Sequence, residues 1–218
     1  MILLFNGPPG TGKDEACLFL ESMYGMTHLS FKKTLFEHTI DYYNVSKEWF
    51  MEGYQQGIKE RKEPALAGLS RREAMIFVSE EVYKPLYGKE YFGYKLCEKI
   101  NKVNDYCFSD GGFLEEIKPV INTVGNQNIS IVQLVREGSD FSKDSRRYID
   151  GDLQQEYVLK HKTPISKQHI LPENLKIRTY RIYNNSTVED FHNTLRKIIK
   201  KERDVYKKTY PNEFDTFI

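Results

Sequence analysis

The sequence predicts an α/β fold in which a mostly parallel sheet is flanked by helices. Short apolar runs of the length of buried strands alternate along the chain with segments whose apolar residues recur at helical spacing. Strands that alternate with helices favour parallel pairing. The chain has 218 residues, of which 39% are hydrophobic and 13% are aromatic, and this suits a single domain over residues 1–218.

The first predicted strand and helix enclose the most informative segment. Residues 1–5 are an apolar run, and residues 15–23 carry apolar side chains at helical spacing. Between them, Gly7, Gly12 and Lys13 fit G-x-x-x-x-G-K, in which backbone amides cradle phosphate oxygens and the lysine reaches the terminal phosphates. The following helix directs its amides and positive dipole end at the anion. The predicted nucleotide site comprises Gly7, Pro8, Pro9, Gly10, Thr11, Gly12, Lys13, Asp14 and Glu15.

Residues 27–104 are predicted to be mainly helical. After a short strand over residues 27–30, we expect helices over 33–44 and 46–54, the second capped by Ser46, and a loop over 55–68. Ser70 begins another helix, with Glu73 completing a capping box, and a further helix covers residues 91–103.

Basic residues at helix starts in this region are candidates to bind a second phosphate. Arg71 and Arg72 follow Ser70, where a phosphate meets both a guanidinium group and a helix N-terminus. Lys33 is a weaker candidate of the same kind. The alternative is that all three are charges on solvated helix starts.

The next two strands end in charged residues. Residues 106–109 are predicted as a strand ending in Asp110, residues 113–124 as a helix, and residues 129–135 as a strand followed by Arg136. Ligands of open parallel sheets bind beyond the carboxyl ends of the strands, so Asp110, Arg136 and the glycine-rich loop should converge. Asp110 is expected either to hold Mg²⁺ through water or orient the attacking oxygen, or simply to cap the next helix.

The segment over residues 136–174 is polar, charged and poor in periodicity, which is typical of a lid or of a disordered segment. It contains Arg146 and Arg147, and arginines delivered by a closing lid stabilise the charge of phosphoryl transfer. A last strand is predicted over 177–183. The final helix is predicted to be capped by Ser186 with Glu189 and to run to about residue 208.

Composition narrows the function classes. The 32 basic and 31 acidic residues give a formal net charge of +1, unlike the basic excess of a dedicated nucleic-acid binder. Cys17, Cys97 and Cys107 share no metal or redox spacing, and no apolar run approaches a membrane span. We therefore expect a cytoplasmic protein without a membrane partner.

Three local patterns resemble the deoxynucleoside monophosphate kinase family of tailed bacteriophages, a branch of the P-loop nucleoside monophosphate kinases. The patterns are Gly12-Lys13-Asp14 at the end of the loop, Leu69-Ser70-Arg71-Arg72-Glu73 leading to Tyr87-Gly88, and Asp144-Ser145-Arg146 downstream of Arg136. Asn184-Asn185-Ser186 is similar to the turn with which these kinases often close the nucleotide site.

The resemblance implies a P-loop NTPase fold with a helical acceptor-binding region over residues 31–104 and a lid over 136–174. It implies transfer of the γ-phosphate of ATP to a deoxynucleoside 5′-monophosphate with Mg²⁺, in the host cytoplasm if a phage encodes the chain. The implied site residues are Lys13, Asp110, Arg136, Arg146 and Arg147 for transfer, the loop with Asn185 for ATP, Lys33, Arg71 and Arg72 for the acceptor, and Asp14 and Asp110 for the metal through water.

Two alternatives stay open at this stage. Family members often have an arginine soon after the strand-end aspartate, whereas Asp110 is followed by Gly111-Gly112-Phe113. This departure motivates a kinase acting on a hydroxymethylated pyrimidine, such as 5-hydroxymethyluracil, in DNA. Asp14 stands where a hydroxyl would hold the metal, and this motivates a non-catalytic nucleotide-binding module. DNA is a partner only under the first alternative, and a homodimer is left open.

Overall fold

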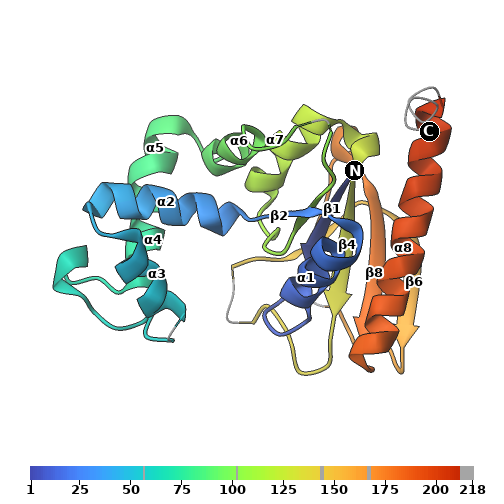
Figure 1. Ribbon diagram of the computed structural model, residues 1–218, viewed down its shortest axis with the longest axis horizontal. Helices are drawn as coiled ribbons and strands as arrows, with labels where there is room; N and C mark the ends of the chain where they lie inside the picture. Colours follow the sequence, from blue (N-terminus) through green and yellow to red (C-terminus); the bar gives the residue numbers. More distant parts are fainter. Residues whose placement is uncertain (56, 102, 143–144, 166–167, 212–218) are drawn as a thin grey trace.

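The computed structural model describes residues 1–55, 57–101, 103–142, 145–165 and 168–211. Its centre is a six-stranded sheet in the order β2-β3-β1-β4-β8-β6, and all its neighbouring strands are parallel (Figure 1). The strands are β1 (Ile2–Asn6), β2 (Thr27–Leu29), β3 (Tyr106–Phe108), β4 (Ile129–Val135), β6 (Asp152–Leu159) and β8 (Arg178–Asn184). The predicted mixed α/β fold with a mostly parallel sheet is confirmed.

Helices cover both faces of this sheet because β1 buries side chains on both. Ile2 and Leu4 pack in the core shared with α7 (Leu114–Val124), whereas Leu3 and Phe5 pack against α1 (Lys13–Tyr24) and α8 (Val188–Thr209). Strands buried on both faces read as continuous apolar runs, as residues 2–5 do. No helix in the described ranges is long and apolar enough to span a bilayer.

A second group of helices extends away from the sheet (Figure 1). We call it the helical arm; it comprises α2 (Phe31–Tyr43), α3 (Lys47–Gln55), α4 (Arg71–Phe77), the π-helical segment Val78–Tyr83, α5 (Lys84–Tyr87) and α6 (Tyr91–Cys97). The arm has a core of its own that includes Phe36, Phe50 and Leu66. The capping box is confirmed, because Ser70 Oγ accepts from the Glu73 amide and Glu73 Oε2 accepts from the Ser70 amide.

Arg71 lies at the centre of the arm. Only 1% of the residue is exposed, and its guanidinium group donates to Glu63 at 3.0 Å and to the carbonyl oxygens of Trp49 and Phe50. The same group lies 4.2 Å from the centre of the Trp49 ring. Buried charges require such partners, so Arg71 is a structural residue of the arm. Arg72 is exposed and lies 3.5 Å from Glu60.

The segment over residues 136–174 contains more regular structure than its sequence predicts. β6 pairs with β8 at the edge of the main sheet, and β5 (Tyr148–Asp150) pairs with β7 (Gln168–Ile170) in a small parallel sheet. β6 shows no clear alternation of apolar and polar residues, because it contains Gln154, Gln155 and Glu156. Polar residues are tolerated there because an edge strand is exposed along much of its length. The expectation of a lid therefore does not hold for β6.

Two helix boundaries also differ from expectation. α6 ends at Cys97 rather than near residue 103. α8 is capped by Thr187 rather than Ser186, because Thr187 Oγ1 accepts from the Asp190 amide at 3.2 Å. The Ser186 hydroxyl donates to the Asp190 carboxylate, and Glu189 does not complete a capping box. The cap lies one residue later than predicted because Ser186 and Thr187 both suit the position.

Replacement of Arg71 by alanine should destabilise the protein by about 3 kcal/mol or more, since it removes a buried ion pair and the packing against Trp49. Urea denaturation followed by Trp49 fluorescence measures this, because Trp49 is the single tryptophan. The matched control is Arg72→Ala, for which we expect a change within about 0.5 kcal/mol. Equal effects of the two substitutions would contradict the structural assignment of Arg71.

Candidate functional site

The loop between β1 and α1 adopts a conformation that requires glycine. A Cβ atom on Gly7 would lie 2.5 Å from the carbonyl oxygen of Leu134 in β4. Gly10 and Gly12 have φ values of 81° and 102°, which L side chains rarely adopt. The three glycines therefore allow the chain to pass close to β4 and then turn into α1, which begins at Lys13.

The loop presents unpaired amides beside a lysine. Among the described residues, the backbone amides of Gly10, Gly12 and Asp14 donate no hydrogen bond. Lys13 Nζ donates to the Pro8 carbonyl at 2.7 Å, which holds the ammonium group against the same loop. Unpaired amides at a helix N-terminus with an adjacent ammonium group favour the binding of an anion.

Asn184, at the end of β8, forms a hydrogen bond with the glycine-rich loop. Its buried side chain donates to the Thr11 carbonyl at 3.0 Å, and a Cβ on Gly12 would lie 3.0 Å from the same nitrogen. Asn185, the residue expected at the nucleotide, instead accepts from the Glu137 amide and donates to the His161 carbonyl. The residue in contact with the loop is therefore Asn184, and Asn185 joins two neighbouring segments.

Asn6, the last residue of β1, forms hydrogen bonds with further segments at this edge of the sheet. Its Nδ2 donates to the Gly111 carbonyl at 2.8 Å and to the Arg147 carbonyl at 3.0 Å, and its Oδ1 accepts from the Ile149 amide at 2.8 Å. The side chain is fully buried. Sequence reasoning missed this residue, although a polar residue that ends an apolar strand is a recognisable feature.

Asp110 joins the arm to the sheet. Its carboxylate accepts from Ser30 Oγ at 2.7 Å and from the amides of Phe31 and Lys32 at 3.2 and 2.8 Å. It therefore caps the N-terminus of α2, which precedes it by almost eighty residues, rather than the helix that follows it. Three hydrogen bonds leave this carboxylate little freedom to bind a metal or orient a nucleophile.

The predicted arginines lie around the loop and the end of β3. The exposed Arg136 donates to the Gly10 carbonyl at 3.2 Å, so its guanidinium group lies at the glycine-rich loop. Arg146 is half-buried and packs over Gly112, where a Cβ would lie 2.5 Å from its Cδ. Arg147 is exposed, and Asp144 of the same motif lies outside the described residues.

The remaining predicted residues are spread over α1 and the arm. Glu15 pairs with His192 at 2.8 Å, and this imidazole stacks on Phe19 with 4.1 Å between ring centres. Lys33 is exposed in the first turn of α2, and Arg72 is exposed in the first turn of α4. Arg71 is buried in the arm, so its predicted contact with a phosphate is not available in this conformation.

Asp14 is the carboxylate best placed for a metal. It is exposed in the first turn of α1, and no hydrogen bond or ion pair involves its side chain in the described ranges. No cluster of three or more His, Cys, Asp or Glu side chains with metal-binding geometry occurs in the described part of the chain. Mg²⁺ commonly binds through one or two carboxylates plus substrate phosphates, and this arrangement fits Asp14.

Glu116, in the first turn of α7, has the most perturbed carboxyl group near these residues. Burial raises its pKa to about 8, and the charges of Asp110 and Glu80 add to this effect against the opposing charges of Lys84 and Arg146. Perturbed carboxyl groups of this kind often mark functional sites. Sequence reasoning missed Glu116, because an acidic residue in a first helical turn is unremarkable.

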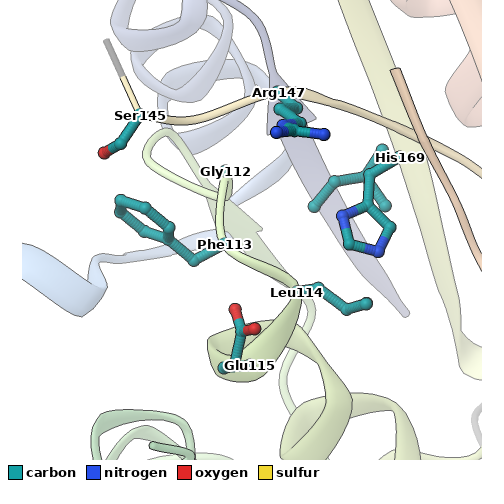
Figure 2. A pocket seen from close by; sticks show the side chains of 8 residues that line it. Gly112, Phe113, Leu114, Glu115, Ser145, Arg147 and His169 are labelled. Carbon is teal, nitrogen blue, oxygen red and sulfur yellow. The ribbon is translucent and has the colours of Figure 1, made fainter. Parts of the chain in front are cut away.

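An open pocket of about 340 Å³ lies beside Gly112 (Figure 2). Arg147 and His169 lie on one side of the chain at Gly112, and Phe113 points away from them toward the other side. Glu115 lines the lower part of the pocket. The chain from Gly112 to Glu115 thus forms one wall of this pocket, and Ser145, Arg147, Ile149 and His169 complete its lining.

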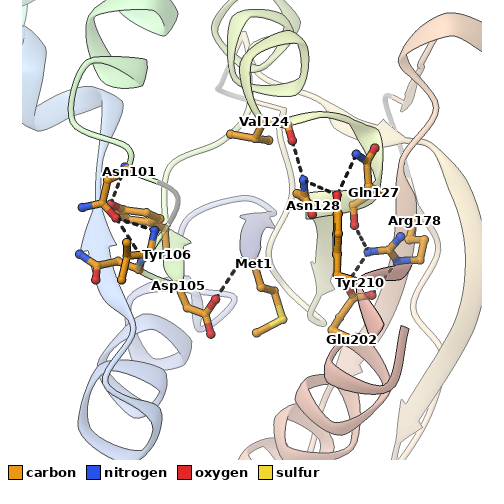
Figure 3. A network of polar contacts seen from close by, with 12 residues as sticks. Met1, Asn101, Asp105, Tyr106, Val124, Gln127, Asn128, Arg178, Glu202 and Tyr210 are labelled. Carbon is orange, nitrogen blue, oxygen red and sulfur yellow. Dashed lines mark hydrogen bonds and ion pairs between the residues drawn. The ribbon is translucent and has the colours of Figure 1, made fainter. Parts of the chain in front are cut away.

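The opposite edge of the sheet carries a second set of polar contacts (Figure 3). The Met1 amino group pairs with Asp105 at 2.7 Å, and Arg178 pairs with Glu202 at 2.7 Å. Tyr210 Oη accepts from the side chain of Asn128 at 3.2 Å. The pair of Met1 and Asp105 ties the start of β1 to the segment before β3, whereas Arg178 and Asn128 join the starts of two other strands to α8 and to Tyr210 after it. These contacts have a structural role.

No model of a known protein family matches this chain, and no curated protein matches it either. Function is therefore inferred from the geometry of the loop, the strand ends and the arm.

Replacement of Asn184 by alanine should loosen the glycine-rich loop, because the Thr11 carbonyl loses a buried donor. We expect a loss of about 1–3 kcal/mol in unfolding free energy. NMR order parameters of the backbone amides over residues 10–14 should fall in this variant. The matched control Asn185→Ala should leave these order parameters unchanged, and an equal fall in both variants would contradict the assignment.

Proposed function

We propose that the chain is an ATP-dependent phosphotransferase with a P-loop NTPase fold, which moves the γ-phosphate of ATP to a deoxynucleoside 5′-monophosphate. The observation that carries this proposal is the loop from Gly7 to Lys13, with its unpaired amides and adjacent ammonium group at the end of a central parallel strand. The strand order is compatible with such a fold. The proposed location is the cytoplasm, where both nucleotides are present.

The chemistry requires positioning and charge stabilisation more than covalent work. An acceptor phosphate oxygen attacks the γ-phosphorus, the bond between that phosphorus and the β,γ-bridging oxygen breaks, and ADP leaves with the electron pair. Lys13 and the loop amides hold the phosphates of ATP. Arg136 is already at the loop, and its guanidinium group is proposed to stabilise the charge on the transferring group together with Arg146 and Arg147.

The metal requirement also fits the residues present. Asp14 would hold Mg²⁺ through water, beside the phosphates that the loop binds. When bound, the ion neutralises charge that develops on the phosphate oxygens. Asp110 is no longer a favoured ligand, because its carboxylate is used by the first turn of α2.

The helical arm is the proposed acceptor side. Asp110 links α2 to the end of β3, so the arm projects from the same edge of the sheet as the loop. With Arg71 buried, Arg72 and Lys33 remain as exposed cations for the acceptor phosphate. The near-neutral net charge favours a small acceptor over DNA, since each DNA phosphate contact requires a cation.

The decisive assay incubates the protein with ATP, Mg²⁺ and each of the four deoxynucleoside monophosphates, and measures ADP and diphosphate. We expect transfer to at least one of them. The absence of phosphate transfer to any of the four would overturn the proposal. Labelled phosphate entering DNA that contains 5-hydroxymethyluracil would then indicate the DNA kinase, and ATP binding without any transfer would indicate a non-catalytic module.

Replacement of Lys13 by alanine should lower kcat by about 10²–10³-fold, because it removes a cation from the transferring phosphates. Steady-state kinetics on the accepted monophosphate measure this. Lys200→Ala is the control, because Lys200 is an exposed lysine of α8 outside the site. Equal activity of the two variants would contradict the role of Lys13.

Replacement of Arg136 by alanine should lower kcat by about 10³-fold and leave the binding of ATP nearly unchanged, because its charge acts on the transition state. Single-turnover kinetics separate the chemical step from binding. Arg203→Ala, on the exposed side of α8, should retain full activity. A change confined to the KM for ATP would assign Arg136 to ground-state binding instead.

A further inference from the structure

A second pocket, with a volume of about 280 Å³, lies between α8 and the edge of the main sheet. Its lining includes Gln154 of β6, Arg178 and Tyr180 of β8, and Lys201, Asp204 and Lys208 of α8. Arg178 begins β8, and the last residue of this strand, Asn184, binds the glycine-rich loop. The pocket and the loop therefore lie at opposite ends of the same strand, and this pocket is separate from the candidate site.

A bulge in β6 forms one wall of the pocket. The pairing of β6 with β8 shifts register between Leu153 and Gln155, so Gln154 is an extra residue on the edge strand. A bulge bends its strand, re-aims the local side chains and occurs frequently beside functional sites. Here Gln154 lines the pocket, and the side chain of Gln155 accepts a hydrogen bond from Lys201 of α8.

Arg178 is held in a fixed position at this pocket. Its guanidinium group donates to the buried Glu202 at 2.9 and 2.7 Å and to the Gln127 carbonyl at 2.8 Å (Figure 3). These bonds use Nε and Nη2, whereas Nη1 donates no hydrogen bond within the described ranges. A preorganised guanidinium group that lines the pocket thus has donors left for a ligand.

Two exposed lysines of α8 add positive charge to the pocket. Lys201 and Lys208 are separated by two helical turns, so they lie on the same face of α8, about 10 Å apart along its axis. Neither lysine pairs with a carboxylate in the part of the chain that the structure describes. Ammonium groups without an acidic partner attract anions to the pocket that they line.

The charge balance of the lining favours an anion over a cation. Glu202 neutralises Arg178, and the remaining charges are those of Lys201, Lys208 and the exposed Asp204. Two positive charges therefore face one negative charge. Solvated lysines on a helix are common, but the fixed guanidinium donors and the bulge give this pocket a built floor and wall.

We propose that this pocket is a second ligand site, which binds a small molecule with at least two anionic groups of the oligophosphate type. One phosphate group binds Nη1 of Arg178 and the ammonium group of Lys201, and the next binds Lys208. A ligand with two such groups contacts both lysines at once, whereas a single phosphate contacts Arg178 and one lysine. The site does not depend on the proposed phosphotransferase activity.

The test is an NMR titration of the ¹⁵N-labelled full-length chain with pyrophosphate and, separately, with inorganic phosphate at constant ionic strength. The backbone amide signals over residues 201–208 should shift and reach saturation. Pyrophosphate should bind about 10-fold more tightly than phosphate, because it makes one further charge-assisted contact. The same shifts should persist in Lys13→Ala, which weakens anion binding at the glycine-rich loop.

Four substitutions of exposed side chains make the test specific. Lys201→Gln and Lys208→Gln should each weaken pyrophosphate binding about 10-fold, because each removes one charged contact. Asp204→Asn should strengthen binding about 3-fold, because it removes the acid from the lining. Lys197→Gln is the matched control on α8 outside the pocket and should change the affinity by less than about 2-fold.

Several results would overturn the proposal. Shifts confined to the glycine-rich loop, or shifts over residues 201–208 that grow without saturation, would show that the pocket binds no ligand specifically. Equal weakening by Lys197→Gln and Lys201→Gln would indicate general attraction of anions to α8. Equal affinities for phosphate and pyrophosphate would overturn the assignment to an oligophosphate.

Free pyrophosphate and the phosphate chain of a nucleotide share this chemistry, and a titration of Lys13→Ala with ATP distinguishes them. Saturating shifts of the same amides with ATP support a nucleotide as the ligand. Shifts with pyrophosphate alone support a free oligophosphate, since the pocket then excludes the nucleoside.

Discussion

The buried side chain of Asn6 is the interaction on which the geometry of the site depends. A buried amide without partners is costly, and here all three hydrogen bonds are made to main-chain groups of other segments. These bonds hold the turn after β3 and the segment before β5 beside the end of β1. Gly7 follows directly and fits against the Leu134 carbonyl. The glycine-rich loop, the turn at Gly111 and the segment at Arg147 are therefore positioned by one strand end.

The arm depends on the same edge of the sheet through a second polar interaction. Asp110 follows β3 and caps α2, so the position of the arm is coupled to the strand next to β1. Inside the arm, Arg71 holds Glu63 and the main chain at Trp49 and Phe50 together. Under the proposed function, an arm fixed to a strand end would hold the acceptor in position relative to the loop, as positioning catalysis requires.

Sequence patterns predicted those features that depend on short-range order. The parallel sheet, the loop from Gly7 to Lys13 and the capping box at Ser70 all follow from spacing within a few residues. The features that were missed depend on long-range partners. The sequence predicts Arg71 as a phosphate ligand or a solvated cation, but Glu63 and the carbonyl oxygens of α3 surround it. Asp110 caps a helix far earlier in the chain. β6 is a strand because β8 pairs with it. Its polar residues alone do not predict a strand.

Although the net charge is near zero, positive and negative side chains are separated within the candidate site. Lys13 and Arg136 place positive charge at the loop, whereas Glu80, Asp110 and Glu116 gather carboxyl groups where the arm meets the sheet. Under the proposed function, the phosphates of ATP would lie at the positive loop, and an acceptor that directs its single phosphate toward the loop would be attracted there and kept away from the carboxylates of Glu80 and Asp110. The proposed small acceptor fits this local division of charge, which the total charge of the chain does not reveal.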